Sequence, residues 1–155
     1  MISALRFLFV SNPFVESIAK AKRLRILLIK MEHDAEHNRY KDILEKANAL
    51  KRIIGVPHAS NEHCLLKLLH KKMQKAAQLP ESDAKNHLKH TINEEMHLVK
   101  MLIHSIVSLS TIKDNKQLYF HVQKMRDIAQ KLLARMMHDL KMCEYIEQAL
   151  KKSKK

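Results

Sequence analysis

The chain contains a single glycine, Gly55, among its 155 residues. Glycine adopts positive φ angles without steric cost, and a compact β fold needs several such positions in its tight turns. Phosphate-binding loops of the P-loop and dinucleotide types also need several glycines. Because 46% of the residues are hydrophobic, the chain has enough apolar surface to build a core. The sequence therefore predicts an all-helical domain in place of a compact β fold, and it excludes nucleotide-binding loops of these two types.

Helix-breaking residues divide the sequence into four expected helices. The stretch Ser11-Asn12-Pro13 is typical of a helix start, because Ser and Asn cap free N–H groups and Pro fits the first turn. Gly55-Val56-Pro57 marks a helix end, and Ser60 and Ser82 are the expected N-caps of the next two helices. Apolar spacing lapses near 34–38, where a kink or a break is expected. The four expected helices cover 13–54, 61–78, 83–112 and 116–151.

Apolar residues recur at steps of three and four along the third and fourth expected helices, among them Leu88 and Ile92. Such seams are typical of antiparallel bundles. We therefore expect an all-α antiparallel helical bundle of about four helices over 1–150, the first long and the second short, with a basic tail over 151–155. Between positions 24 and 29, apolar residues of the first expected helix lie on all of its sides. This segment must lie at the centre of the bundle or be covered by a partner chain, so that a homo-oligomer is one of two expected arrangements.

Basic residues exceed acidic ones by 29 to 16, which gives a formal net charge of +13. They gather in three regions, at the first helix, at the second helix and at the tail. In the second helix Lys67, Lys71 and Lys75 stack on one stripe with Lys72 beside them, and no acid lies between Glu62 and Glu81. This spacing predicts an uncompensated cationic face. The candidate anion-binding residues are Lys20, Lys22, Arg23, Arg25, Lys67, Lys71, Lys72, Lys75, Lys151, Lys152, Lys154 and Lys155.

The function expected from this charge is a non-enzymatic binding or adaptor module. Its partner is an acidic protein or an anionic membrane surface, met through basic helix faces. Nucleic acid is an alternative, although zinc-finger spacing and a helix-turn-helix glycine are lacking and stacking aromatics are few. Lysine-rich, glycine-poor helical composition also occurs in bacterial secreted effectors, which is a further alternative. No catalytic residue is proposed, because a GxSxG motif is absent and the neighbours His63 and Cys64 do not face each other on a helix.

Eleven histidines leave three interpretations open: metal ligands, a pH response or surface residues. His33 and His37 share a helix face at the i,i+4 spacing of metal ligands. Glu94 and His97 match the ExxH spacing of carboxylate-bridged di-metal bundles, but their stripe lies opposite the apolar seam of the same helix. These four residues are the candidate ligands, and no cofactor is expected. His33 shares a stripe with apolar residues and is expected to be buried.

The two cysteines, Cys64 and Cys143, form no CxxC motif and are expected to be buried apolar residues. A reducing, cytoplasmic location follows from this expectation, with secretion into a host cell as the alternative. The apolar segment 1–10 is short, is interrupted by Arg6 and precedes no small-residue cleavage site, so a signal peptide is not expected. No uncharged apolar stretch reaches the length of a membrane span.

Overall fold

The computed structural model describes residues 12–58 and 61–153. These residues form five α-helices and one 3₁₀ turn and include no strand, which confirms the all-helical prediction. The expected N-cap Ser60, the segment 1–10 and the basic residues Lys154 and Lys155 lie outside the described residues. The elements are α2 (Pro13–Glu36), α3 (Tyr40–Ile54), α4 (Leu65–Ala77), α5 (Asp83–Ser108), η1 (Leu109–Thr111) and α6 (Asn115–Ser153).

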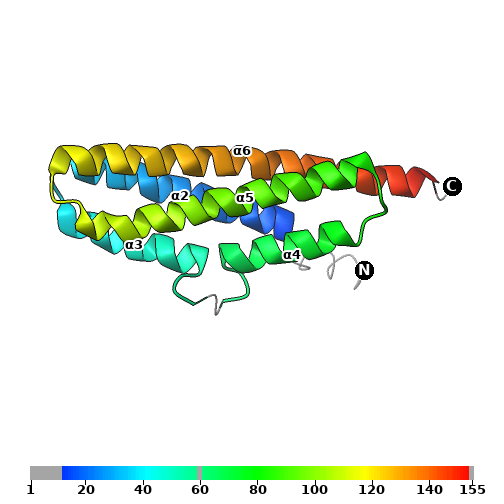
Figure 1. The fold of residues 1–155 in the computed structure, drawn as a ribbon, viewed down its shortest axis with the longest axis horizontal. Coiled ribbons are helices and arrows are strands. Elements are labelled where there is room, and N and C mark those ends of the chain that lie inside the picture. Colours follow the sequence, from blue (N-terminus) through cyan, green and yellow to red (C-terminus); the bar gives the residue numbers. More distant parts are fainter. Residues whose placement is uncertain (1–11, 59–60, 154–155) are drawn as a thin grey trace, which may run out of the picture.

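The helices lie side by side along one long axis (Figure 1). α2, α5 and α6 each extend along most of the molecule, whereas α3 and α4 lie end to end on one side. α6 packs against both α2 and α5, and α4 packs against the same two helices from the other side. Residues far apart in sequence therefore meet where α2, α4, α5 and α6 surround a common interior.

The first expected helix, over 13–54, is wrong as a single element, because the chain turns back after Glu36. Asn38 adopts a left-handed φ of 57°, a conformation that asparagine tolerates better than most residues. The Arg39 N–H donates to the Asp34 carbonyl at 2.8 Å and closes the turn. The lapse in apolar spacing near 34–38 thus marks a complete break, and α3 returns along α2.

The other helix ends lie within a few residues of the predicted ones. The Asn12 side chain accepts from the Phe14 N–H at 3.0 Å, and the Ser82 hydroxyl accepts from the Lys85 N–H at 3.1 Å, so both predicted caps are confirmed. Gly55 ends α3 with φ 105°, a left-handed angle for which glycine is preferred. α4 begins later than expected, at Leu65, and α5 ends earlier, before η1.

The apolar seams of the two long C-terminal helices face the interior, as their spacing predicts. Leu88, Ile92 and Val99 of α5 are fully buried. Both cysteines are buried and free, which confirms their predicted place in the core. The apolar stretch 24–29 is only partly covered within this chain, since Ile26 and Ile29 remain 52% and 43% exposed.

Candidate functional site

The lysines of α4 do not form the expected cationic face, because Lys72 points into the core. Its side chain is 0% exposed. The Lys72 Nζ lies 2.5 Å from Glu95 Oε1, 2.7 Å from Asp139 Oδ2 and 3.3 Å from Ser17 Oγ. The prediction that Lys72 binds an external anion is therefore wrong. Its partners come from α2, α5 and α6, so no stretch of sequence around position 72 contains them.

We call Ser17, Lys72, Glu95 and Asp139 the buried polar cluster. Burial is the main reason why the pKa of Glu95 is raised, to about 9, and the hydrogen bond with Asp139 acts in the same direction. The nearby Lys72 ammonium lowers the pKa of Glu95 but does not offset these two effects. Glu95 is thus protonated at neutral pH. A neutral carboxyl group is far cheaper to bury than an ionised one.

Two further α4 lysines are compensated at the surface. Lys71 Nζ lies 3.4 Å from a Glu62 carboxylate oxygen, and Lys75 Nζ lies 3.4 Å from Glu147 Oε1. Lys67 is half-buried. The expectation of an uncompensated cationic face on this helix is therefore wrong, because one acid comes from the loop before α4 and another from α6.

The solvent-facing side of α2 keeps the basic character that the sequence predicts. Between Glu16 and Glu32 it carries five basic residues and no acid. Lys20 lies at the edge of this side and is half-buried, whereas the other four basic residues are exposed. No ion pair joins any of the five to an acid of the described residues. The exposed residues that define the α2 outer face are Val15, Lys22, Arg23, Arg25, Ile26, Ile29 and Lys30.

Aliphatic side chains lie among these charges. Val15, Ile26 and Ile29 are 50%, 52% and 43% exposed. At 100° per residue they fall within one narrow arc that also holds Lys22, with Arg25 on one side of it and Lys30 and Arg23 on the other. The α2 outer face is therefore both cationic and apolar. The third basic region lies apart from α2: Lys151 and Lys152 are exposed at the end of α6, which extends beyond the other helices (Figure 1).

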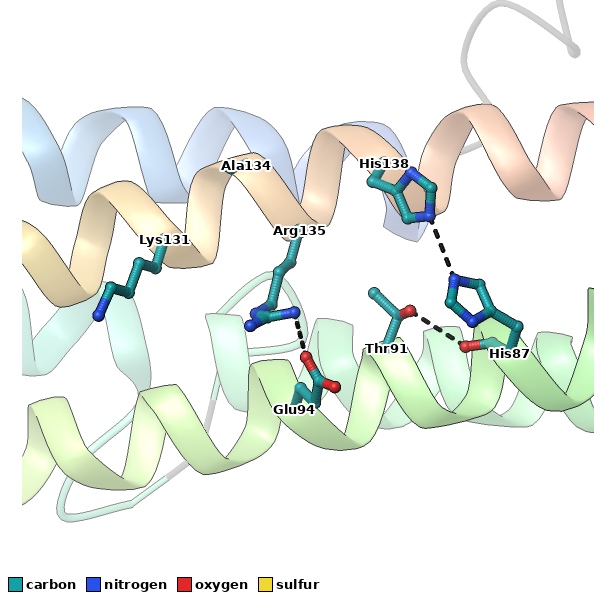
Figure 2. Close-up of a pocket in the computed structure, with 7 residues that line it drawn as sticks. All are labelled: His87, Thr91, Glu94, Lys131, Ala134, Arg135 and His138. Carbon is teal, nitrogen blue, oxygen red and sulfur yellow. Dashed lines mark hydrogen bonds and ion pairs between the residues drawn. The ribbon is translucent and has the colours of Figure 1, made fainter.

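A shallow groove of about 400 Å³ lies between α5 and α6, and two histidines, His87 and His138, face each other at one end of it (Figure 2). The His87 and His138 Nε2 atoms approach to 3.4 Å across the groove. Glu94 forms an ion pair with Arg135, and its other carboxylate oxygen lies 2.9 Å from His90 Nε2. Arg135 and the His90 ring thus contact the Glu94 carboxylate, and the described residues place Glu94 and His97 in no group of three or more potential ligands.

The candidate pair at the end of α2 does come together, but at the surface. His33 is exposed, so the expectation that it is buried is wrong. The buried residue at this place is Asp34, which pairs with Lys46 of α3. The His33 and His37 rings lie 4.3 Å apart between centroids. Glu36, which the spacing argument did not select, joins them, and the ligand atoms of all three lie within 4.8 Å of one another.

The buried polar cluster is the largest feature that the sequence analysis missed, although a signal for it exists. Asp139 lies three residues after Met136 and four before Cys143, both buried in α6. Glu95 has the same place between Ile92 and Val99 of α5. A charged residue at a core position of a 3–4 seam requires a buried partner of opposite charge. Lys72, Glu95 and Asp139 are three such residues on three helices, so each of them indicates that the others are its buried partners.

Each helix of the described residues is too short or too polar to cross a membrane. Comparison of the chain with protein-family models, with curated proteins and with solved structures finds no match.

Proposed function

We propose that this chain is a binding module, without catalytic activity, that attaches to an anionic membrane surface through the α2 outer face. One observation carries the proposal: four exposed basic side chains surround exposed aliphatic ones on a helix face that holds no acid between Glu16 and Glu32. Lipid phosphates and anionic headgroups match the charges, and the shallow apolar part of the interface accepts the aliphatic side chains.

The charges are numerous enough to produce measurable attachment. A basic residue near an anionic membrane contributes about 1 kcal/mol, so the four exposed basic residues of the face contribute about 4 kcal/mol together. The 24 residues of α2 extend over roughly 36 Å, and a straight helix can lay the whole face on a flat surface. The aliphatic side chains add apolar area whose attraction does not depend on salt.

The opposite side of α2 holds the helix firmly in place. Phe14, Leu24 and Leu28 are fully buried, and Glu32 pairs with Arg126 of α6 at 2.6 Å. In an antiparallel four-helix arrangement, in which α3 and α4 lie end to end in the place of one helix, α2 would present a rigid surface. This arrangement supports attachment of the folded protein as a whole, without refolding of α2 in the lipid.

Vesicle flotation tests the proposal. The full chain is mixed with vesicles of phosphatidylcholine, with and without a minor share of phosphatidylserine. We expect binding only to the anionic vesicles, and we expect binding to weaken as salt rises because the ions screen exposed charges. The test variant reverses the four exposed basic residues of the face: Lys22→Glu, Arg23→Glu, Arg25→Glu and Lys30→Glu. This variant should lose about 4 kcal/mol or more of binding free energy, which weakens its partitioning onto the vesicles by roughly a thousandfold.

A matched control separates location from net charge. Several exposed lysines outside α2 lack an acidic partner among the described residues, and the control uses four of them. The control variant carries Lys100→Glu, Lys113→Glu, Lys116→Glu and Lys124→Glu. It has the same net charge as the test variant, and we expect it to keep most of the binding. Equal loss in both variants would show that only net charge matters. Absence of binding by the unaltered chain would reject a membrane partner and leave an acidic protein as the partner to test.

A further inference from the structure

The end of α2 carries a second kind of binding chemistry, which is independent of the basic charges. His33, Glu36 and His37 are all exposed, and their i, i+3 and i+4 spacing sets them on one side of the last helical turn. One nitrogen from each imidazole and one carboxylate oxygen lie within 4.8 Å of one another. Ligands around a zinc ion need separations somewhat shorter than this, since metal–nitrogen bonds are about 2.0–2.1 Å. Exposed side chains can close that gap by small rotations.

The hydrogen bond of His37 prepares its ring for a metal. Nδ1 of His37 lies 3.0 Å from the His33 carbonyl oxygen. A carbonyl oxygen only accepts, so Nδ1 carries the hydrogen and donates it. In the neutral ring the lone pair is therefore on Nε2, which is the nitrogen able to bind a metal. Metal-binding histidines commonly donate their second ring nitrogen to a carbonyl in this way.

The position of the cluster in the helix also favours a cation. The residues lie in the last turn of α2, where the carbonyl groups carry the negative end of the helix dipole. Two imidazoles and one carboxylate suit the borderline ions Zn²⁺, Cu²⁺ and Ni²⁺, whereas Mg²⁺ and Ca²⁺ prefer oxygen ligands alone.

We propose that His33, Glu36 and His37 form a surface site for one divalent transition-metal ion of the zinc type, with a fourth position open to water or to a ligand from another molecule. The bound ion would join the last turn of α2 to its C-cap residue His37, next to the turn that leads into α3. Open fourth positions are typical of zinc sites that exchange ligands, in contrast to the closed sites that only support a fold.

Calorimetric titration of the full chain, without a histidine tag, with ZnCl₂ tests the site. We expect one ion per chain with micromolar affinity. His33→Ala, Glu36→Gln and His37→Ala should each weaken binding by at least about tenfold. Because the three residues are exposed, these variants should keep the circular dichroism spectrum of the unaltered chain, so that a loss reports the ligands and not the fold.

The groove between α5 and α6 provides the matched control. Its two histidines form the other close imidazole pair in the described part of the chain, with Nε2 atoms 3.4 Å apart. The double variant His87→Ala with His138→Ala should bind zinc as the unaltered chain does. If this variant loses the ion, or if His33→Ala with His37→Ala keeps it, the proposed site is wrong.

A spectroscopic measurement identifies the ligands directly. Cu²⁺ added at one equivalent should give an electron paramagnetic resonance spectrum with hyperfine splitting from two imidazole nitrogens. The splitting should simplify to that of one nitrogen in His37→Ala. An unchanged spectrum in this variant would overturn the proposal. Vesicle binding measured with excess chelator tests the α2 outer face separately, since that face needs no metal.

Discussion

Lys72 of α4 and Lys22 of α2 belong to neighbouring helices and carry the same side chain, but their surroundings are opposite. The Lys72 ammonium is enclosed with Ser17, Glu95 and Asp139, whereas Lys22 is exposed on a face without an acidic partner among the described residues. The difference depends on what the other helices bring to each position. Packing delivers two acidic side chains to the interior side of α4 and none to the outer side of α2, so of these two lysines only Lys22 remains available to a partner.

The largest effect on stability is expected from the variant Lys72→Met. Removal of one member of a buried charge network leaves the others without compensation and costs about 3–5 kcal/mol. Denaturation by urea, followed by circular dichroism, measures the loss of unfolding free energy. Lys22→Met is the matched control at an exposed position, where a change within about 0.5 kcal/mol is expected. Equal losses in the two variants would contradict the contrast between the two lysines.

The pH dependence of stability should reveal the buried polar cluster. The pKa of Glu95 is about 9 in the folded chain and 4.5 in its ordinary state. Between these values the folded state binds one more proton than the unfolded state, so the unfolding free energy falls as pH rises. The contribution of Glu95 is complete below pH 4.5 and is lost through about pH 9. Over this range the contribution of Glu95 to the unfolding free energy falls by roughly 1 kcal/mol per pH unit.

Urea denaturation at a series of pH values measures this slope. Glu95→Gln is the informative variant, because an amide resembles the protonated acid and does not titrate. We expect the decline in stability over this pH range to be much shallower in Glu95→Gln than in the unaltered chain. The same decline in both proteins would show that Glu95 is ionised in the core. The exposed basic residues of α2 should have no such effect.

Lys75 lies between the two extremes and should give an intermediate, small effect. Its ammonium is 3.4 Å from Glu147 and 5.8 Å from the centre of the Phe14 ring, but both members of the ion pair are partly exposed. Solvent screens such pairs, so Lys75→Met should cost less than about 1 kcal/mol in the same denaturation assay. A loss as large as that of Lys72→Met would mean that burial does not distinguish the α4 lysines.

The sequence predicted the features that depend on local spacing. The caps Asn12 and Ser82, the end at Gly55 and the seams of α5 and α6 follow from the chemistry of neighbouring residues. At Asn38 the sequence predicts either a kink or a break and does not decide between them. Helix propensity alone does not determine whether α3 continues α2 or returns along it. The pairing of Arg39 N–H with the Asp34 carbonyl is part of the turn itself.

The buried polar cluster and the metal ligands show why the rest was harder to predict. The partners of Lys72 are 23 and 67 positions away, at Glu95 and Asp139, and their approach depends on how three helices pack. His33 was expected to be buried because Ile29 and Tyr40 lie on its stripe, yet both are exposed. Amphipathic spacing identifies a stripe, but the packing of other helices decides whether that stripe is covered.

Site-specific fluorescence provides the most direct test of the membrane-binding face. Cys64 and Cys143 are buried, and burial raises the pKa of the Cys143 thiol to about 11, so an introduced surface cysteine should react selectively with a dye. An environment-sensitive dye is attached at Ile26→Cys on the α2 outer face or at Met101→Cys on α5, both exposed positions. On addition of phosphatidylserine vesicles we predict a blue shift for the label at position 26 and none at position 101. A shift only at position 101, or no shift at either position, would contradict attachment through α2.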